Sequence, residues 1–544
     1  MNKKNEIEKL KTEIEGLKKE LKKRKKYGLV WEEKTEEVVE MCKEKLPVLK
    51  EVKNKEIITD KNKPVNLLIE GDNYHSLSVL NYTHEKKVDV IYIDPPYNTG
   101  NKDFIFNDRY VDREDAYRHS KWLAFMEKRL KLAKNLLKDT GVIFISIDDN
   151  EMASLKLLMD SSDLFGEDNF VDCITWEKKS SAKGVPPVNM LVNVHEYIVA
   201  YQKSSKFSFL GEPRSLGGFS NPDNDPRGPW RNTNIKSTVK DKSQAFTITD
   251  PKTGNSFTDT WAYSKEEIKR LIKENYLIFP KSKNGQVRKK EFYNEFKREN
   301  IPIKSSWGLF DNQKNTEMLK DILGDAIFLN PKPLDLLIYL LKSTTKKDAL
   351  ILDFMAGSGT TAHAILKLNE EDGGNRKFIL CTNNEDNNGN GYKIAEDICY
   401  PRVKKVIEGY VGKISRKKVE GLGSNLKYFK TEFVDAEPTD KNKIKLTEQA
   451  TEMLCVKEGT FEKVLDQKKF KIFKNSNHYT GIIFDQTAIP AFKKVIKDIK
   501  GKFSVYVFSL GDETFDDELK DVKQKVQLSP IPEVILRVYR RIFE

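Results

Sequence analysis

The 544-residue sequence lacks any apolar stretch long enough to span a membrane. A membrane-spanning helix needs about 20 consecutive apolar residues. The lysine-rich start of the chain is also not followed by the hydrophobic core of a secretion signal. We therefore expect no membrane segment and a cytoplasmic location.

Cysteine and histidine are scarce. The five cysteines form no C-x-x-C pair, and the six histidines stand at no metal-binding spacing with them. This excludes a disulfide-stapled secreted scaffold, and it predicts no metal site. We expect reduced, mostly structural thiols in a chain with room for about three or four domains.

Charge of neither sign dominates. The chain has 95 Lys and Arg against 83 Asp and Glu, which gives a net charge of +12 and a pI near 9.0. A basic balance suits a polyanionic partner such as nucleic acid, but a mixed surface carries little information by itself. The function must therefore be inferred from motifs.

The most informative segment, residues 90–100, reads V-I-Y-I-D-P-P-Y-N-T-G. A run of β-favouring residues ends in an acid, two prolines and an aromatic. This predicts a strand that stops abruptly and presents Asp94 and Tyr97 beyond its carboxyl end. Ligands bind at that edge of an open α/β sheet.

This corner suits transfer to the exocyclic amino group of a nucleic-acid base. Asp94 and a rigid carbonyl at Pro95 can accept the two amino hydrogens and make the nitrogen nucleophilic. Tyr97 offers a stacking face worth about 1–3 kcal/mol, and a base held this way has left its duplex. The alternative is a rigid turn in which Tyr97 is a packing residue.

A second motif occupies residues 349–361, A-L-I-L-D-F-M-A-G-S-G-T-T. An apolar strand runs into Asp353 and Phe354, and a helical pattern follows. Gly357 and Gly359 let the backbone approach a ligand at the start of that helix, where a carboxylate is favoured. A dinucleotide or phosphate loop is disfavoured because the third glycine and the lysine are missing. A tight turn without a ligand is the alternative.

The next predicted strand, residues 377–382, ends shortly before Glu385. An acid at this point would meet the hydroxyl pair of a ribose one strand over. S-adenosylmethionine is a cofactor with both a ribose and a carboxylate. Glu385 as an ordinary loop acid is the alternative.

Together the two motifs resemble the β group of amino-directed DNA methyltransferases, in which D-P-P-Y precedes an F-x-G-x-G cofactor loop. The resemblance covers roughly residues 30–430, with about 260 residues between the two motifs, enough for an inserted domain. The wording I-D-P-P-Y-N-T-G and the segment D-P-R-G-P-W at 225–230 are most similar to modification subunits of type III restriction systems. Other matching segments are L-L-I-E-G-D at 67–72, D-F-I-F-N-D-R-Y at 103–110, G-V-I-F-I-S-I-D at 141–148, V-H-E-Y-I-V-A-Y at 194–201 and N-P-K-P-L-D-L-L at 330–337.

The resemblance implies an α/β fold, a permuted Rossmann-like methyltransferase dependent on S-adenosylmethionine. Because the motif begins with aspartate, the resemblance implies methyl transfer to adenine N6 rather than cytosine N4. We expect the transfer to be direct, without a covalent intermediate, because the methyl sulfonium of the cofactor is already a strong electrophile. The catalytic residues would be Asp94, Pro95, Pro96 and Tyr97. The cofactor residues would be Asp72, Lys332, Asp353, Phe354, Gly357, Gly359, Thr360 and Glu385. For Lys332, an ordinary exposed lysine is the alternative.

Five segments are expected. They are an amphipathic or coiled-coil helix at 1–28, a catalytic half at 29–202, a target-recognition domain at 203–325, a cofactor half at 326–436 and a small α/β domain at 437–544. In the first, Ile7, Leu10, Ile14, Leu17 and Leu21 follow a short a/d pattern, which favours a homodimer or a single helix lying on its own domain.

The expected recognition domain mixes aromatic and basic residues with Gly, Asn and Pro, as suits contacts with bases and phosphates of double-stranded DNA. Arg227, Trp230 and Arg231 are the predicted DNA contacts, although this turn could instead brace the cofactor site. The resemblance also implies a helicase-nuclease restriction subunit as partner. A solitary methyltransferase and a catalytically silent DNA-specificity subunit are the alternative functions.

Overall fold

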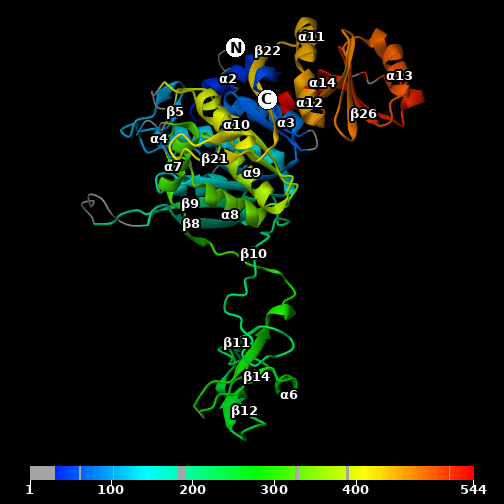
Figure 1. Ribbon diagram of the computed structural model, residues 1–544. Helices are drawn as coiled ribbons and strands as arrows, with labels where there is room; N and C mark the ends of the chain where they lie inside the picture. The colour runs from blue at the N-terminus through cyan, green and yellow to red at the C-terminus, as the bar shows by residue number, and fades with distance from the viewer. Residues whose placement is uncertain are drawn as a thin grey trace, which may run out of the picture. The chain divides into compact units, whose positions relative to one another are not determined.

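The computed structural model describes residues 31–60, 63–101, 103–180, 190–282, 284–324, 328, 330–386, 391–511, 513 and 515–543 (Figure 1). The predicted N-terminal coiled-coil helix lies outside these residues. The chain divides into two compact units. One is Leu210–Ile303, called here the insert, and the other contains the described residues on both sides of it, called here the main unit.

An eleven-stranded mixed sheet organises the described part of the main unit. Its strand order is β1-β22-β3-β19-β18-β4-β7-β9-β8-β17, with β2 paired to β22. The strands are β1 (Lys45–Glu51), β2 (Ile57–Ile58), β3 (Val65–Glu70), β4 (Val88–Ile93), β7 (Leu137–Ile147), β8 (Phe170–Glu177), β9 (His195–Gln202), β17 (Ser306–Leu309), β18 (Leu350–Asp353), β19 (Lys377–Thr382) and β22 (Asn425–Asp435).

The six central strands from β22 to β7 run parallel, whereas β9 is antiparallel to both β7 and β8. β4 has the composition of a strand covered on both faces: Val90, Ile91 and Ile93 are each at most 1% exposed. The two strands that carry the motifs are neighbours, because Ile351 lies opposite Val90 and Leu352 opposite Ile91.

The order of these strands confirms the permuted fold. β18 and β19 lie between β3 and β4 in the sheet, although they follow the insert in the chain. From β4, helix α4 (Arg118–Leu136) leads to β7, whereas from β18, helix α9 (Thr360–Asp372) leads the opposite way to β19. The carboxyl ends of β18 and β4 therefore form the switch point at which open α/β sheets bind ligands.

Right-handed crossovers that run in opposite directions place their helices on opposite faces of a sheet. Accordingly, α3 (Asn73–Thr83) packs with α4, and α9 packs with α8 (Leu334–Thr344) and α10 (Tyr400–Glu408) (Figure 1). No described helix has the combined length and apolar character that crossing a membrane requires.

The C-terminal segment forms the predicted α/β arrangement, but it does not separate from the main unit. Helices α12 (Thr451–Glu458) and α14 (Glu533–Phe543) pack on α3, so Leu454 and Tyr539 share a hydrophobic core with Leu77. The remaining elements are α11 (Asp440–Gln449), β23 (Glu462–Asp466), β24 (Phe470–Lys474), β25 (His478–Ile483), α13 (Ile489–Lys497), β26 (Lys502–Phe508) and β27 (Val526–Ile531).

The insert has its own core around Trp261, Ile268 and Leu271. Its ends pair with each other through β10 (Glu212–Pro213) and β16 (Asn300–Ile301). Its other elements are β11 (Trp230–Asn234), β12 (Phe246–Thr249), β13 (Ser256–Asp259), α6 (Lys265–Lys273), β14 (Leu277–Ile278) and β15 (Arg288–Phe292).

The insert is shorter than the predicted range 203–325. The segment after Ile303 returns to the main unit because β17 pairs with β8, and α7 (Asn312–Leu323) packs on α10. Trp307 accordingly lies at the edge of the large sheet, with its ring 4.8 Å from that of Tyr339. A side chain expected in the recognition domain is therefore buried in the main unit.

Candidate active site

The D-P-P-Y turn directly follows β4 and is fixed by two hydrogen bonds between it and α4. The indole N–H of Trp122 donates to the carbonyl of Pro96 at 2.7 Å. Asn98, fully buried with a φ of 56°, donates to the carbonyl of Arg118 at 3.2 Å. Left-handed backbone is accessible to asparagine at low cost. The turn is therefore held rigidly before any ligand arrives.

Four side chains from different parts of the chain meet beyond β4. The ammonium of Lys332 donates to the Tyr97 hydroxyl at 2.5 Å and to Glu196 Oε2 at 2.7 Å, and it lies 3.4 Å from Asp94 Oδ1. Tyr97 in turn donates to Glu196 at 3.0 Å. We call Asp94, Tyr97, Glu196 and Lys332 the lysine cluster.

Burial dominates the electrostatics of this cluster. The Asp94 side chain is 30% exposed, yet the loss of surrounding water raises its pKa to about 6, with Lys332 opposing the rise and Glu196 adding to it. Burial would also raise the pKa of Glu196, but Lys332 holds it below the usual value. The Lys332 cation is therefore shared by two carboxylates, and it stabilises the ionised form of Glu196 more than that of Asp94.

The segment between β18 and α9, residues 354–359, contains Gly357 and Gly359 and is called here the glycine loop. Asp353 is 2% exposed and accepts hydrogen bonds from the Met355 amide at 3.0 Å and the Thr361 hydroxyl at 2.5 Å. Burial raises the pKa of Asp353 to about 7, and the charge on Asp94 adds to the rise. Two carboxyl groups with raised pKa values thus stand at adjacent strand ends.

The two glycines are needed for different reasons. Both have left-handed backbone, with φ of 48° at Gly357 and 75° at Gly359. A Cβ atom at Gly359 would lie 3.1 Å from the sulfur of Cys399, just before α10, and 3.2 Å from Cγ2 of Val403 in α10, so glycine allows the loop to approach α10 closely. A Cβ at Gly357 would lie 3.0 Å from the ring of Phe328.

Two residues expected to line a cofactor are engaged in the protein interior. The hydroxyl of Thr360 accepts from the buried guanidinium of Arg402 at 2.7 Å. Phe354 is fully buried in the main core. Both residues support the loop from behind, which is a structural contribution that the motif alone did not distinguish from ligand contact.

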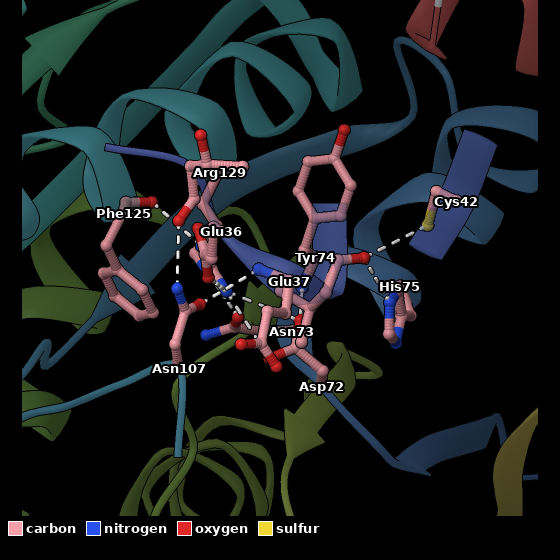
Figure 2. Close-up of polar contacts among 12 residues, drawn as sticks. Glu36, Glu37, Cys42, Asp72, Asn73, Tyr74, His75, Asn107, Phe125 and Arg129 are labelled. Atoms are coloured by element: carbon pink, nitrogen blue, oxygen red, sulfur yellow. Dashed lines mark hydrogen bonds and ion pairs between the residues drawn. The ribbon is translucent and has the colours of Figure 1, made fainter. Parts of the chain in front are cut away.

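Asp72 lies at the end of β3 and caps α3, where its side chain accepts from the Tyr74 amide at 2.6 Å. Figure 2 shows the polar contacts behind it. The fully buried Arg129 pairs with Glu36 at 2.6 Å and with Asp72 at 3.4 Å. Asn107 holds the segment around Glu36 by accepting from the Glu37 amide at 2.9 Å. The residues before β1 therefore help to orient Asp72.

Glu385 follows β19, the strand next to β3. Its side chain is exposed. Although the residue is solvent-accessible, nearby protein atoms displace part of the water around its carboxylate and raise its pKa, and the negative charge of Asp72 raises it further. The structure therefore brings Asp72 and Glu385 to the same edge of the sheet as Asp94 and Asp353, as predicted.

The three predicted DNA contacts in the insert differ in availability. Arg227 binds Asp225 through two nitrogens at 2.9 and 2.7 Å, donates to the Glu274 carbonyl at 3.0 Å and stacks 4.4 Å from the Tyr276 ring. Arg231 instead pairs with Glu291 at 2.7 Å while 44% of its side chain is exposed.

Trp230 donates its indole N–H to Asp223 at 2.8 Å. Because its donors are occupied within the insert, Arg227 braces this unit, whereas Arg231 retains an accessible guanidinium.

Glu196, Arg129 and Glu36 have no role in the sequence-based prediction. Glu196 stands in the matched segment V-H-E-Y-I-V-A-Y, where an acid inside an otherwise apolar strand is the available signal. Arg129 and Glu36 lie 93 residues apart. No local pattern indicates that they pair, because their contact depends on how the sheet is assembled.

Comparison with known proteins identifies relatives. A family model described as DNA methylase matches residues 88–400. The type III restriction-modification enzyme StyLTI Mod subunit of Salmonella typhimurium is 36% identical over 395 residues, covering 66% of this chain and 59% of that protein. The type II methyltransferase M.KpnI of Klebsiella pneumoniae is 34% identical over 383 residues, covering 64% of this chain and 89% of that protein.

The type III restriction-modification enzyme EcoPI Mod subunit of Escherichia phage P1 is 33% identical over 416 residues, covering 63% of this chain and 62% of that protein. The matches thus span about three fifths of the length of these two Mod subunits.

Proposed function

The chain belongs to the DNA methylase family, and on that premise we propose that it is a sequence-specific adenine-N6 DNA methyltransferase that uses S-adenosylmethionine. The observation that carries this proposal is the position of Asp94 and Tyr97 at the switch point of the sheet, next to Asp353 and its glycine loop. A ligand at that point would meet both motifs at once.

The donor set fits this cofactor. S-adenosylmethionine supplies an electrophilic methyl group on a positively charged sulfur. Asp94 and Asp353 have raised pKa values, and a cation near them would relieve the unfavourable burial of their charge. Asp72 and Glu385, at the next two strand ends, can accept hydrogen bonds from ribose hydroxyls. In this proposal Gly357 leaves room beside the loop, and Phe354, Gly359 and Thr360 support it.

The protein's part in the chemistry is to bind and orient the base. Asp94 and the Pro95 carbonyl accept the two amino hydrogens, and Tyr97 stacks on the ring of an adenine that has left its duplex. As the bond between N6 and the methyl carbon forms, the bond from that carbon to sulfur breaks. The surplus proton on N6 passes to Asp94. The buried cysteines have no role.

Recognition of double-stranded DNA is assigned to the insert. Residues 210–303 contain 18 Lys and Arg against 12 Asp and Glu, a net charge of +6 that is half of the total for the chain. Basic residues concentrated on a small unit favour phosphate contact. Arg231 is the favoured contact among the predicted three, and Trp230 is a second, whereas Arg227 acts by supporting their turn.

The similarity to Mod subunits supports a modification and DNA-recognition role in a type III restriction system. In that role the chain would act in the cytoplasm as a homodimer and would bind a helicase-nuclease restriction subunit. A solitary methyltransferase is the second candidate, favoured by the similarity to M.KpnI. A catalytically silent specificity subunit would not require the lysine cluster.

The proposal is tested by single-molecule sequencing of DNA from cells that lack adenine methylation and express either the intact chain or Asp94→Ala. We expect N6-methyladenine in one short motif with the intact chain and none with the variant. Binding of S-adenosylmethionine, measured by calorimetry on both proteins, should be retained in the variant. The same modification level with Asp94→Ala would contradict the acceptor role. Cofactor binding and specific DNA binding without any modification would favour the silent subunit.

A further inference from the structure

Lys332 has no hydrogen-bonding capacity left for a cofactor. An ammonium group has three N–H donors. In Lys332 they face the Tyr97 hydroxyl at 2.5 Å, Glu196 at 2.7 Å and Asp94 at 3.4 Å. The side chain is 8% exposed. Its contacts are therefore with the catalytic turn and with β9, and this differs from the cofactor-binding role expected from the motif.

We propose that Lys332 and Glu196 are positioning residues that hold Asp94 and Tyr97 in the arrangement needed to receive the adenine. The inference deepens the proposed function and rests on it. Lys332 stabilises the ionised form of Asp94, and Glu196 sets how much of that stabilisation Asp94 receives. The same two side chains fix the Tyr97 hydroxyl, so the ring is oriented before the base stacks on it.

The geometry explains why two residues are needed. A buried ammonium beside Asp94 alone would bind that carboxylate tightly and compete with the amino group for its oxygens. Glu196 draws Lys332 toward itself, since its distance to the ammonium is 2.7 Å and that of Asp94 is 3.4 Å. Asp94 thereby stays charged but keeps oxygen lone pairs free for the substrate.

Glu196 is itself anchored from a second side. Lys178 lies 3.3 Å from its other oxygen, Oε1. The Lys178 side chain is 24% exposed and no ion pair joins it to Asp94 among the described residues. It provides a matched control, because removing it takes a lysine from the same carboxylate without removing the cation beside Asp94.

Several titratable groups influence Asp94. Lys332 precedes α8, Glu196 lies on β9, Tyr97 follows in the same turn, Tyr92 lies on β4 and Asp353 ends β18. Burial and the charge on Asp94 raise the pKa of Tyr92 and of Tyr97, so both are neutral near pH 7. Lys332 is charged, because Asp94 and Glu196 outweigh the effect of its burial on its pKa.

The experiment compares the acidic limb of the pH–rate profile in four proteins: the intact chain, Glu196→Gln, Lys332→Met and Lys178→Met. The readout is transfer of labelled methyl from S-adenosylmethionine to unmethylated bacterial genomic DNA. Glu196→Gln removes an anion near Asp94 and frees Lys332 to approach it, so the limb should move to lower pH by about one unit. Lys332→Met should move it about one unit or more to higher pH. Lys178→Met should leave it within a few tenths of a unit.

Two further measurements keep the test decisive. Lys332→Arg should restore most of the rate lost in Lys332→Met, and calorimetry should give S-adenosylmethionine affinities within about threefold of the intact chain for all variants that fold. If Lys332→Met does not fold, the direction of the Glu196→Gln shift decides the matter. A limb that stays in place in Glu196→Gln and Lys332→Met, as it would if Asp353 set it, overturns the inference.

A tenfold loss of cofactor affinity in Lys332→Met with an unmoved limb also overturns it and restores the cofactor-binding role. Absence of any transfer by the intact chain would instead refute the proposed function.

Discussion

The main unit and the insert each contain a buried group of paired charges, and the ratio of cations to carboxylates differs between them. In the main unit one cation serves two acids: Lys332 lies between Asp94 and Glu196, and Arg129 lies between Glu36 and Asp72. In the insert Asp225 receives two cations, Arg227 and Lys290, and Lys290 also pairs with Asp223.

The pKa values of the aspartates at the two sites shift in opposite directions. Burial raises the pKa of Asp94 to about 6 and that of Asp353 to about 7. In the insert, hydrogen bonds from Lys290 lower the pKa of Asp223, and hydrogen bonds from Arg227 and Lys290 lower that of Asp225. A carboxylate whose charge is fully compensated by cations stabilises the fold. A carboxylate that shares its cation with a second acid remains available to a ligand. The chemistry is expected where pairing is incomplete.

The difference between the two sites predicts that removal of Arg129 destabilises the protein more than removal of Arg227. Arg129→Met leaves Glu36 and Asp72 without their cation and should destabilise the main unit by about 3–5 kcal/mol. Arg227→Met leaves Asp225 paired with Lys290 at 2.9 Å and should destabilise the insert by only about 1–3 kcal/mol. Denaturant titration followed by hydrogen exchange of peptides from each unit measures both values. Equal losses would show that sharing a cation has no special cost.

A second test concerns the loop of Gly357 and Gly359, which follows β18 next to Asp94 and Asp353. Gly357→Val forces a β-branched residue into φ of 48° and brings its Cβ to 3.0 Å from Phe328. The strain should weaken S-adenosylmethionine binding by about 10–100-fold, roughly 1–3 kcal/mol. Calorimetry measures the affinity, with Gly254→Val as control, since a Cβ at Gly254 in the insert meets no atom within 4 Å. An unchanged affinity for the first variant would remove this loop from the cofactor site.

The end of β18 and the turn that holds Asp223 and Asp225 should also respond oppositely to pH. A raised pKa in the folded state gives stability that is present below the unfolded value and is lost as pH rises. Asp353, with 3.8 rising to about 7, should therefore make β18 at least tenfold easier to open as pH goes from about 4 to 7.

Lowered pKa values, as at Asp223 and Asp225, give stability that is lost as pH falls below about 4. Hydrogen exchange corrected for intrinsic rates measures both trends, and Asp353→Asn should abolish the first. A parallel response of β18 and of the Asp223–Asp225 turn would contradict this prediction.

The smallest effect is expected at the surface of the insert. Arg231→Ala should change stability by less than about 1 kcal/mol, because its pair with Glu291 is exposed. If Arg231 contacts a phosphate, the slope of log affinity against log salt should fall by about 0.9. Fluorescence anisotropy with duplex DNA at several salt concentrations measures this slope. An identical slope would assign the contact to other lysines or arginines.

The sequence predicted the parts of the site that depend on local backbone. The D-P-P-Y turn, the Asp353 glycine loop and their order along the chain were sufficient to predict a permuted α/β fold with both motifs at one sheet edge. The order of β18 beside β4 confirms that prediction. The turn that follows such a strand can be predicted because its conformation depends on residues close together in the sequence.

Contacts between distant segments could not be predicted in this way. Lys332 and Asp94 are 238 positions apart in the sequence and meet only because β4 and the start of α8 reach the same edge. The end of the insert was predicted too late because β17 returns to the sheet through a single short pairing with β8. The C-terminal segment was expected to be separate because it follows a charged stretch and alternates strand-like with helical runs. Its helices α12 and α14 instead bury apolar faces on α3.

The paired ends of the insert have an evolutionary consequence. Glu212 lies opposite Ile301 and Pro213 opposite Asn300, so the unit leaves and rejoins the chain at one narrow neck. Exchange of the genetic segment between these two points would replace the whole unit while the distance to be bridged stays the same. Asp94, Lys332 and Glu196 all lie outside that segment. Under the proposed function, replacement of this unit would change target preference and leave the residues of the reaction chemistry in place.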